Sequence, residues 1–345
     1  MSKQVKKIIE GVERIGWGTT TCLCFVGSTI AVMRHLGEKV TNEYAMGISG
    51  GAFKMFWEMP WGPANCDLLI IGDEPVRRTF DALGYGFTFV HKLAPIHTKE
   101  EFRKMVVDSI DRGRPIIAEG IVGPPECCVV TGYDEGGAIL HGWSYFQEDQ
   151  SYFIKDDWYK DCDGLILIGE KKPKPSQREV LINTLVWAIK LAREPEFVWG
   201  FPRIRRTKSG LMAFDAMAEQ LLWDDIYEFS ASNLDALSMR TVPITNDGIL
   251  IMQCKRAYAR DFTKSMANEG LPGSNELHKA SEEYSQEEKV WGRAVEMAPG
   301  WGSVLKEKLA NKAHRSELSR LVRKARVHEE RAVGHLEDAL SELVT

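Results

Sequence analysis

Apolar residues follow two different periods along this chain, and the change of period divides it. In residues 22–36 and 98–115, apolar positions recur every three or four residues, which is the spacing of a helix with one buried face. From residue 115 to residue 170, short apolar runs such as "ECCVVTGYD" and "AILHGWSYF" are separated by turn residues, which is typical of an antiparallel meander. Helices followed by such strands predict an α+β domain.

The segment "EKKPKPSQ", residues 170–177, interrupts both periods with two prolines and several charges, and we place a domain boundary there. Beyond it the helical period dominates, and the last 45 residues predict one or two long amphipathic helices. One apolar stripe in this half consists of Leu211, Phe214, Met217 and Leu221. The pattern therefore predicts an α+β domain over residues 1–172 and an all-α domain over residues 177–345.

Composition excludes some classes of function and leaves others open. A formal net charge of −5 implies no general attraction to nucleic acid or to an anionic membrane. The N-terminus lacks the apolar region of a secretory signal, and no apolar run is long enough for a spanning helix, so we expect a cytoplasmic protein. Seven cysteines at irregular spacings argue against a disulfide framework and suit a reducing compartment.

The stretch "TTTCLCFVGSTIAVMRHLG" places Cys22 and Cys24 where a helix is expected to begin. If Thr20 or Thr21 caps this helix, both thiols lie in its first turn, where the helix N-terminus stabilises a thiolate nucleophile. The glycine at position 18 offers a backbone amide for an oxyanion. Two other interpretations remain: a redox pair of thiols, and small buried side chains with no chemical role.

Several segments carry a resemblance to a known family. They are "CFVGSTIAVMRHLG", "YAMGISGGAFKMFW", "PPECCVVTGYDEGGAILHGWSYFQ" and, more thinly, "GLMAFDAMAEQL". In these segments the chain resembles the papain-like cysteine peptidases, including bacterial forms, and more specifically the family of the butirosin biosynthesis protein H N-terminal domain. The resemblance implies a papain-like N-terminal fold, a cysteine nucleophile, and aminoacyl transfer from an acidic acyl carrier protein onto an amine. The aromatic residue that follows Cys24 fits the peptidases better than the surroundings of Cys22.

The chain departs from the peptidase pattern at two positions. The family's histidine stands six residues before the glycine of "GY", and here that position is Glu126; the family's glutamine is replaced by Gly18. His141 lies on the next predicted strand, so one interpretation is that Glu126 and His141 have exchanged roles as carboxylate and base. The alternative is a catalytically inactive papain-like module that binds a small molecule or a peptide.

We therefore predict Cys24, Cys22, Glu126 and His141 as catalytic candidates. The candidates for substrate binding are Thr21, Gly18, Trp143 and Phe56. The expected reaction is cysteine-dependent acyl transfer or amide hydrolysis on a small-molecule or peptide-like substrate. The basic run "RIRRTK" is a candidate docking site for an acidic carrier protein, and the charged C-terminal helices favour a homodimer. We expect no cofactor and no metal; His328 and His335, two helical turns apart, do not have the usual ligand spacing.

Overall fold

The chain forms two compact units, each described here by itself. The computed structural model describes residues 5–58, 65–93, 96–148, 150–199, 205–224, 243–298 and 303–345. Unit 1 consists of Met1–Ala45 and Asp73–Pro175, and unit 2 of Met46–Gly72 and Ser176–Thr345. The sequence predicted two continuous domains with one boundary near residue 175, whereas the segment Met46–Gly72 belongs to the helical unit. Helix α2 (Asn42–Ile48) spans the residues where the chain passes from one unit to the other.

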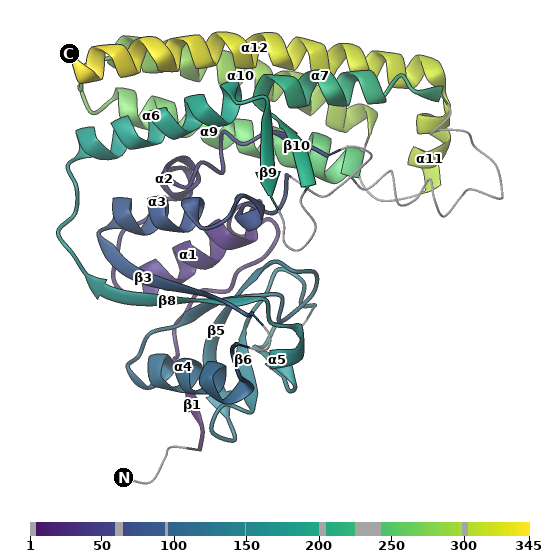
Figure 1. Cartoon of the computed structure of the whole chain (residues 1–345). Helices are drawn as coiled ribbons and strands as arrows, with labels where there is room; N and C mark the ends of the chain where they lie inside the picture. Colours follow the sequence, from purple (N-terminus) through teal and green to yellow (C-terminus); the bar gives the residue numbers. More distant parts are fainter. Residues whose placement is uncertain are drawn as a thin grey trace. The chain divides into compact units, whose positions relative to one another are not determined.

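Unit 1 is built on one antiparallel sheet (Figure 1). Its strands are β1 (Lys7–Ile8), β3 (Tyr85–His91), β4 (Ile116–Glu119), β5 (Cys127–Asp134), β6 (Ile139–Trp143), β7 (Phe153–Lys155) and β8 (Gly164–Lys171). Its helices are α1 (Cys24–His35), α3 (Glu74–Leu83), α4 (Lys99–Asp111) and α5 (Trp158–Asp161). The strand order is β3-β8-β4-β5-β6-β7, with β1 paired to β5, and every pairing is antiparallel. The predicted α+β class is confirmed.

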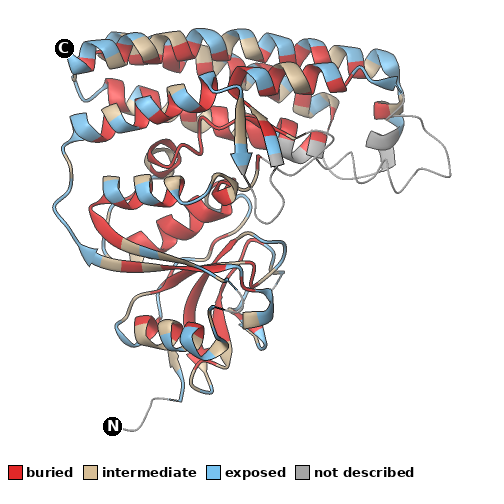
Figure 2. Cartoon of the chain, viewed as in Figure 1, coloured by how far each residue is buried: buried red, intermediate tan, exposed pale blue. Residues whose placement is uncertain are grey.

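Helices cover both faces of this sheet. Helix α1 packs against β4 and β5, and α4 contacts these strands from the opposite face (Figure 1). Helix α4 begins at the predicted threonine cap: Thr98 accepts from the backbone of Glu101 at 3.2 Å, and the Glu101 carboxylate accepts from the backbone of Thr98 at 2.7 Å. Helix α1 is buried along most of its length (Figure 2), as a helix between a sheet and other elements must be.

Strands β5 and β6 form the predicted antiparallel hairpin. Val129 pairs with Trp143, and His141 pairs with Gly132 after a register shift. Glycines 136 and 137 in the turn have positive φ, which glycine adopts without steric cost. This register decides which residues lie near Glu126, which directly precedes β5.

Unit 2 is helical apart from a small sheet. Its helices are α6 (Gln177–Arg193), α7 (Gly210–Gln220), α9 (Ile251–Ala267), α10 (Ser274–Met297), α11 (Ser303–Ala310), α12 (Lys312–Val344), the 3-10 helix η1 (Leu69–Ile71) and the π-helix η3 (Pro243–Leu250). The sheet consists of β2 (Phe56–Trp57), β9 (Glu196–Trp199) and β10 (Arg205–Ser209), in the order β2-β10-β9. The C-terminal half is therefore helical with one hairpin, β9–β10, rather than purely helical. The predicted stripe on α7 is confirmed, because Phe214, Met217 and Leu221 lie in the core.

Arg256 lies fully buried on α9 between two carboxylates and the segment Met46–Gly72. Its Nε is 3.0 Å from Glu287 Oε1 on α10 and 2.8 Å from Glu329 Oε2 on α12. Its Nη1 donates to the Ala52 carbonyl at 2.7 Å. The neighbouring Lys255, also buried, donates to the Lys54 carbonyl at 3.0 Å. Two adjacent cations on α9 thus hold the segment Met46–Gly72 against the long helices.

This cluster pairs one guanidinium with two carboxylates, so one negative charge is in excess. Burial raises the pKa of Glu287 well above its ordinary value; the Arg256 guanidinium opposes the rise, and the Glu329 carboxylate adds to it. Glu287 therefore holds a proton in the folded state. A protonated Glu287 shared with Glu329 balances the charge of Arg256, which makes burial of the cluster tolerable.

Arg256→Met should destabilise the protein by about 3 to 5 kcal/mol, because it leaves two buried carboxylates without a cation. Glu287→Gln should change the free energy of unfolding by about 1 kcal/mol or less, because glutamine resembles the protonated acid. Urea unfolding followed by circular dichroism measures both.

The two variants should also differ with pH. Folded Glu287 keeps a proton that the unfolded chain releases above the ordinary pKa of 4.5, so the wild type loses stability as the pH rises above that value. Glu287→Gln removes this loss. Equal destabilisation by both substitutions would contradict the assignment of the proton to Glu287.

Candidate active site

The structure brings Cys24 and Glu126 into direct contact. Cys24 is the first residue of α1, and its thiol Sγ donates to Glu126 Oε2 at 2.5 Å. Because α1 packs on β5, the start of the helix meets the residue that precedes the strand. The first amides of a helix have no acceptor within it, and they favour negative charge on a nearby side chain. A thiol that is 2% exposed thus has both a proton acceptor and an electropositive helix end.

The helix starts later than the sequence predicted. Its N-cap is Leu23, with extended backbone and no capping side chain, rather than Thr20 or Thr21. The Thr21 hydroxyl instead contacts Leu23, donating to its carbonyl at 3.0 Å. Cys22 therefore precedes the helix instead of lying in its first turn, and Cys24 is the cysteine that contacts Glu126.

Tyr145, which the sequence analysis did not select, lies beside the two cysteines. Its hydroxyl donates to the Thr21 carbonyl at 2.9 Å and is 2.5 Å from the Thr20 hydroxyl. Burial raises the pKa of Tyr145 well above its ordinary value, and the nearby Cys24 and Cys22 add to the rise. Tyr145 is therefore a neutral hydroxyl near the thiol. A polar aromatic residue just after a buried strand was the available signal.

Aromatic rings next to Tyr145 reach the surface. The Trp17 ring lies edge-on to Tyr145 at 4.9 Å and to Phe146 at 6.0 Å, and these two flanking side chains are 48% and 37% exposed. Gly18, a candidate binding residue, follows Trp17 in the same exposed turn, with a φ of +77° that suits glycine. Backbone and aromatic groups, rather than charges, surround the approach to this region.

The structure does not bring His141 to Cys24, and the proposed exchange of roles with Glu126 is corrected. His141 pairs with Gly132, six residues along β5 from Glu126. At about 3.4 Å per residue, this separates the two by roughly 20 Å. The nearby charges of His141 are Lys6 and Asp134, and burial lowers its pKa below the ordinary value. His141 belongs to the other end of the hairpin.

Two aromatic candidates have structural roles. Trp143 is 9% exposed and donates through Nε1 to the Val12 carbonyl at 3.1 Å, which fixes the N-terminal segment on the hairpin. Phe56 belongs to unit 2, where it is buried on β2 and packs on Phe197 at 5.1 Å between ring centroids. Neither is part of the Cys24 site as unit 1 presents it.

The basic run "RIRRTK" forms strand β10 rather than a loop. Lys208 Nζ bonds Glu196 at 2.5 Å, and Arg206 lies 3.5 Å from the same carboxylate. Arg203 lies outside the described residues. Strand β9 thus neutralises part of the charge for which an acidic partner was predicted.

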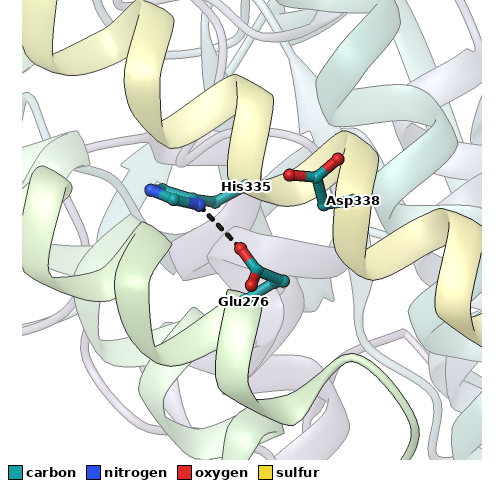
Figure 3. A group of neighbouring side chains, drawn as sticks. All are labelled: Glu276, His335 and Asp338. Carbon is teal, nitrogen blue, oxygen red and sulfur yellow. Dashed lines mark hydrogen bonds and ion pairs between the residues drawn. The ribbon is translucent and has the colours of Figure 1, made fainter.

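Glu276, His335 and Asp338 form a group whose side chains are typical metal ligands (Figure 3). Their ligand atoms lie within 4.8 Å of one another. However, Glu276 already accepts from His335 Nδ1 at 2.7 Å and from Lys279 at 2.6 Å. A cation would have to displace this lysine, so the group is better explained as an ion-pair contact between α10 and α12.

Comparison with known proteins leaves the family of the chain open. The chain matches no protein-family model, and no curated protein matches it significantly. None of the helices in the described residues is long and apolar enough to cross a membrane.

Gly27→Ala should disrupt this site. A Cβ at position 27 would lie 2.0 Å from the Tyr145 hydroxyl, so the ring must move away from Thr20 and Thr21. We expect a loss of about 1 to 3 kcal/mol in the free energy of unfolding. Adding Tyr145→Phe should restore part of this loss, because it removes the nearest clashing atom.

The matched control is Gly334→Ala on α12, where an added Cβ meets no heavy atom within 4 Å. It should stabilise the protein by up to about 1 kcal/mol, because alanine is the better helix former. Thermal unfolding compares the variants. If both alanine variants behaved alike, the contact of Gly27 with Tyr145 would have no energetic weight.

Proposed function

We propose that unit 1 is a cysteine-dependent acyl-transfer domain in which Cys24 is the nucleophile and Glu126 accepts its proton. The observation that carries the proposal is the 2.5 Å contact between Sγ and Oε2 at the first residue of a helix. The resemblance to butirosin biosynthesis protein H-like acyltransferases supports the same reaction class and the same cysteine.

The reaction has two balanced steps. Cys24 Sγ transfers its proton to Glu126 and attacks the carbonyl carbon of the acyl donor, forming a carbon–sulfur bond. The leaving group departs with the proton from Glu126, and an acyl-thioester remains on Cys24. An amine or water then attacks the thioester, gives its proton to Glu126, and releases the acyl product and the thiol.

A carboxylate limits which acyl donors react. The ordinary pKa of a thiol is about 8.5 and that of glutamic acid about 4.3, so moving the proton costs about 6 kcal/mol before the helix N-terminus contributes. Peptide amides add the cost of a poor leaving group. Thioesters and activated esters, whose leaving groups are weaker bases, suit this pair better. We therefore favour acyl transfer from a thioester over hydrolysis of an amide.

A second function has support from one observation. Cys24 is 2% exposed, which fits a catalytically inactive domain that binds a small acyl or peptide-like ligand beside Trp17 and Phe146. The same site serves both functions, and its reactivity toward an acyl donor separates them.

The test is acylation by an aryl thioester such as S-phenyl thioacetate, followed by intact mass and peptide mapping. We expect one acetyl group on Cys24, although Cys66 and Cys254 are more accessible. Accessibility alone predicts the reverse order, so the two act as internal standards. Glu126→Gln should slow acylation of Cys24 by roughly 10² to 10⁴-fold.

Cys22→Ser is the matched control, since it removes the neighbouring thiol without touching the Cys24–Glu126 contact. It should acylate at the wild-type rate. If Cys24 reacts no faster than Cys66 and Cys254, the enzyme proposal fails, and binding of the unreacted thioester would then support the binding module.

A further inference from the structure

Helices α10 and α12 run antiparallel and are joined at regular intervals by charged pairs. His335 Nδ1 is 2.7 Å from Glu276, and His328 Nδ1 is 2.7 Å from Glu283. The partners are seven residues apart on each helix, so the next contact in this register joins Val290 to Leu321. Both are buried, as the repeat of a packed helix pair requires.

Around this apolar contact the charges become alike instead of opposite. A cavity of about 180 Å³ opens there between the two helices. Its lining residues are Gln286, Lys289, Val290, Arg293, Arg320, Leu321, Lys324 and His328. Four of these are permanent cations, and none is a carboxylate. In the register of the two helices, Lys289 faces Lys324 and Arg293 faces Arg320.

Neighbouring acids compensate this charge in part. Glu317 bonds Arg320 at 2.6 Å and lies 3.9 Å from Arg293. Lys289 and Lys324 have no ion pair within the described part of the chain. Like charges that face each other weaken the association of two helices, and the chain as a whole carries a net charge of −5. Positive charge concentrated here opposes packing, so it needs an explanation other than stability.

We propose that Lys289, Arg293, Arg320 and Lys324 bind the phosphate groups of a small phosphorylated ligand. Arginine presents a planar fork to phosphate oxygens, and lysine adds compact charge, so the set combines both modes of phosphate binding. His328, whose Nδ1 contacts Glu283, lines the same cavity and adds a ring nitrogen. The volume suits one or two phosphate groups rather than a large polyanion. The site lies wholly in unit 2 and is independent of the reaction proposed for Cys24.

The test is calorimetric titration of the full chain with inorganic pyrophosphate at low ionic strength. Lys289→Gln/Lys324→Gln should weaken binding by about tenfold or more, because each substitution removes a charge-assisted contact. The control, Lys264→Gln/Arg323→Gln, removes the same number of charges at exposed positions outside the cavity. It should retain affinity within about twofold.

Thermal unfolding without ligand gives a second readout. The groove variant should unfold at a higher temperature than the wild type, because the facing lysines repel each other. A lower unfolding temperature would assign the lysines to structure and overturn the proposal. So would absence of pyrophosphate binding, or an equal loss of affinity in the control. Tighter binding of a glutamate-rich peptide than of pyrophosphate would also overturn it, since the surface would then recognise an acidic protein.

Discussion

The buried guanidinium of Arg256 constrains the helical unit more than any other described contact. A cation removed from water needs anionic and carbonyl partners on all sides, and these come from Glu287, Glu329 and Ala52. Three separate helices and the segment Met46–Gly72 must therefore meet at one place. Apolar packing alone tolerates sliding of one helix along another, whereas these directional bonds fix a single register. The long α10–α12 pair and the cavity along it depend on that register.

In unit 1 the equivalent constraint is the packing of α1 against β5. It decides that Cys24 meets Glu126, and the hairpin register decides that His141 lies at the other end of the strand. Tyr145 and Gly27 fit each other so closely that the residue type at one determines the space for the other. A thiol with a carboxylate and a neutral hydroxyl is a weaker base system than a thiol with imidazole. Its chemistry is accordingly matched to reactive acyl donors.

Local signals in the sequence predicted the local structure well. Thr98 with Glu101 predicted the start of α4, and the stripe on α7 predicted a buried face, because both depend on neighbours three or four residues away. The long-range contacts were harder. The alternation in "AILHGW" predicts a strand but not which end of β5 faces His141, since a bulge shifts the register. Arg256 resembles any exposed arginine of an amphipathic helix until its distant carboxylates are placed.

The division of the chain has a consequence for synthesis on the ribosome. Residues 46–72 emerge early, yet the helices they pack against follow residue 175. Phe53, Met55 and Phe56 are buried in the finished unit, so during translation they stay exposed until α9 has been made. Unit 1, by contrast, has all its strands once residue 171 has emerged. The nascent chain thus carries a folded sheet domain with an unsatisfied apolar loop, which is the kind of intermediate that chaperones bind.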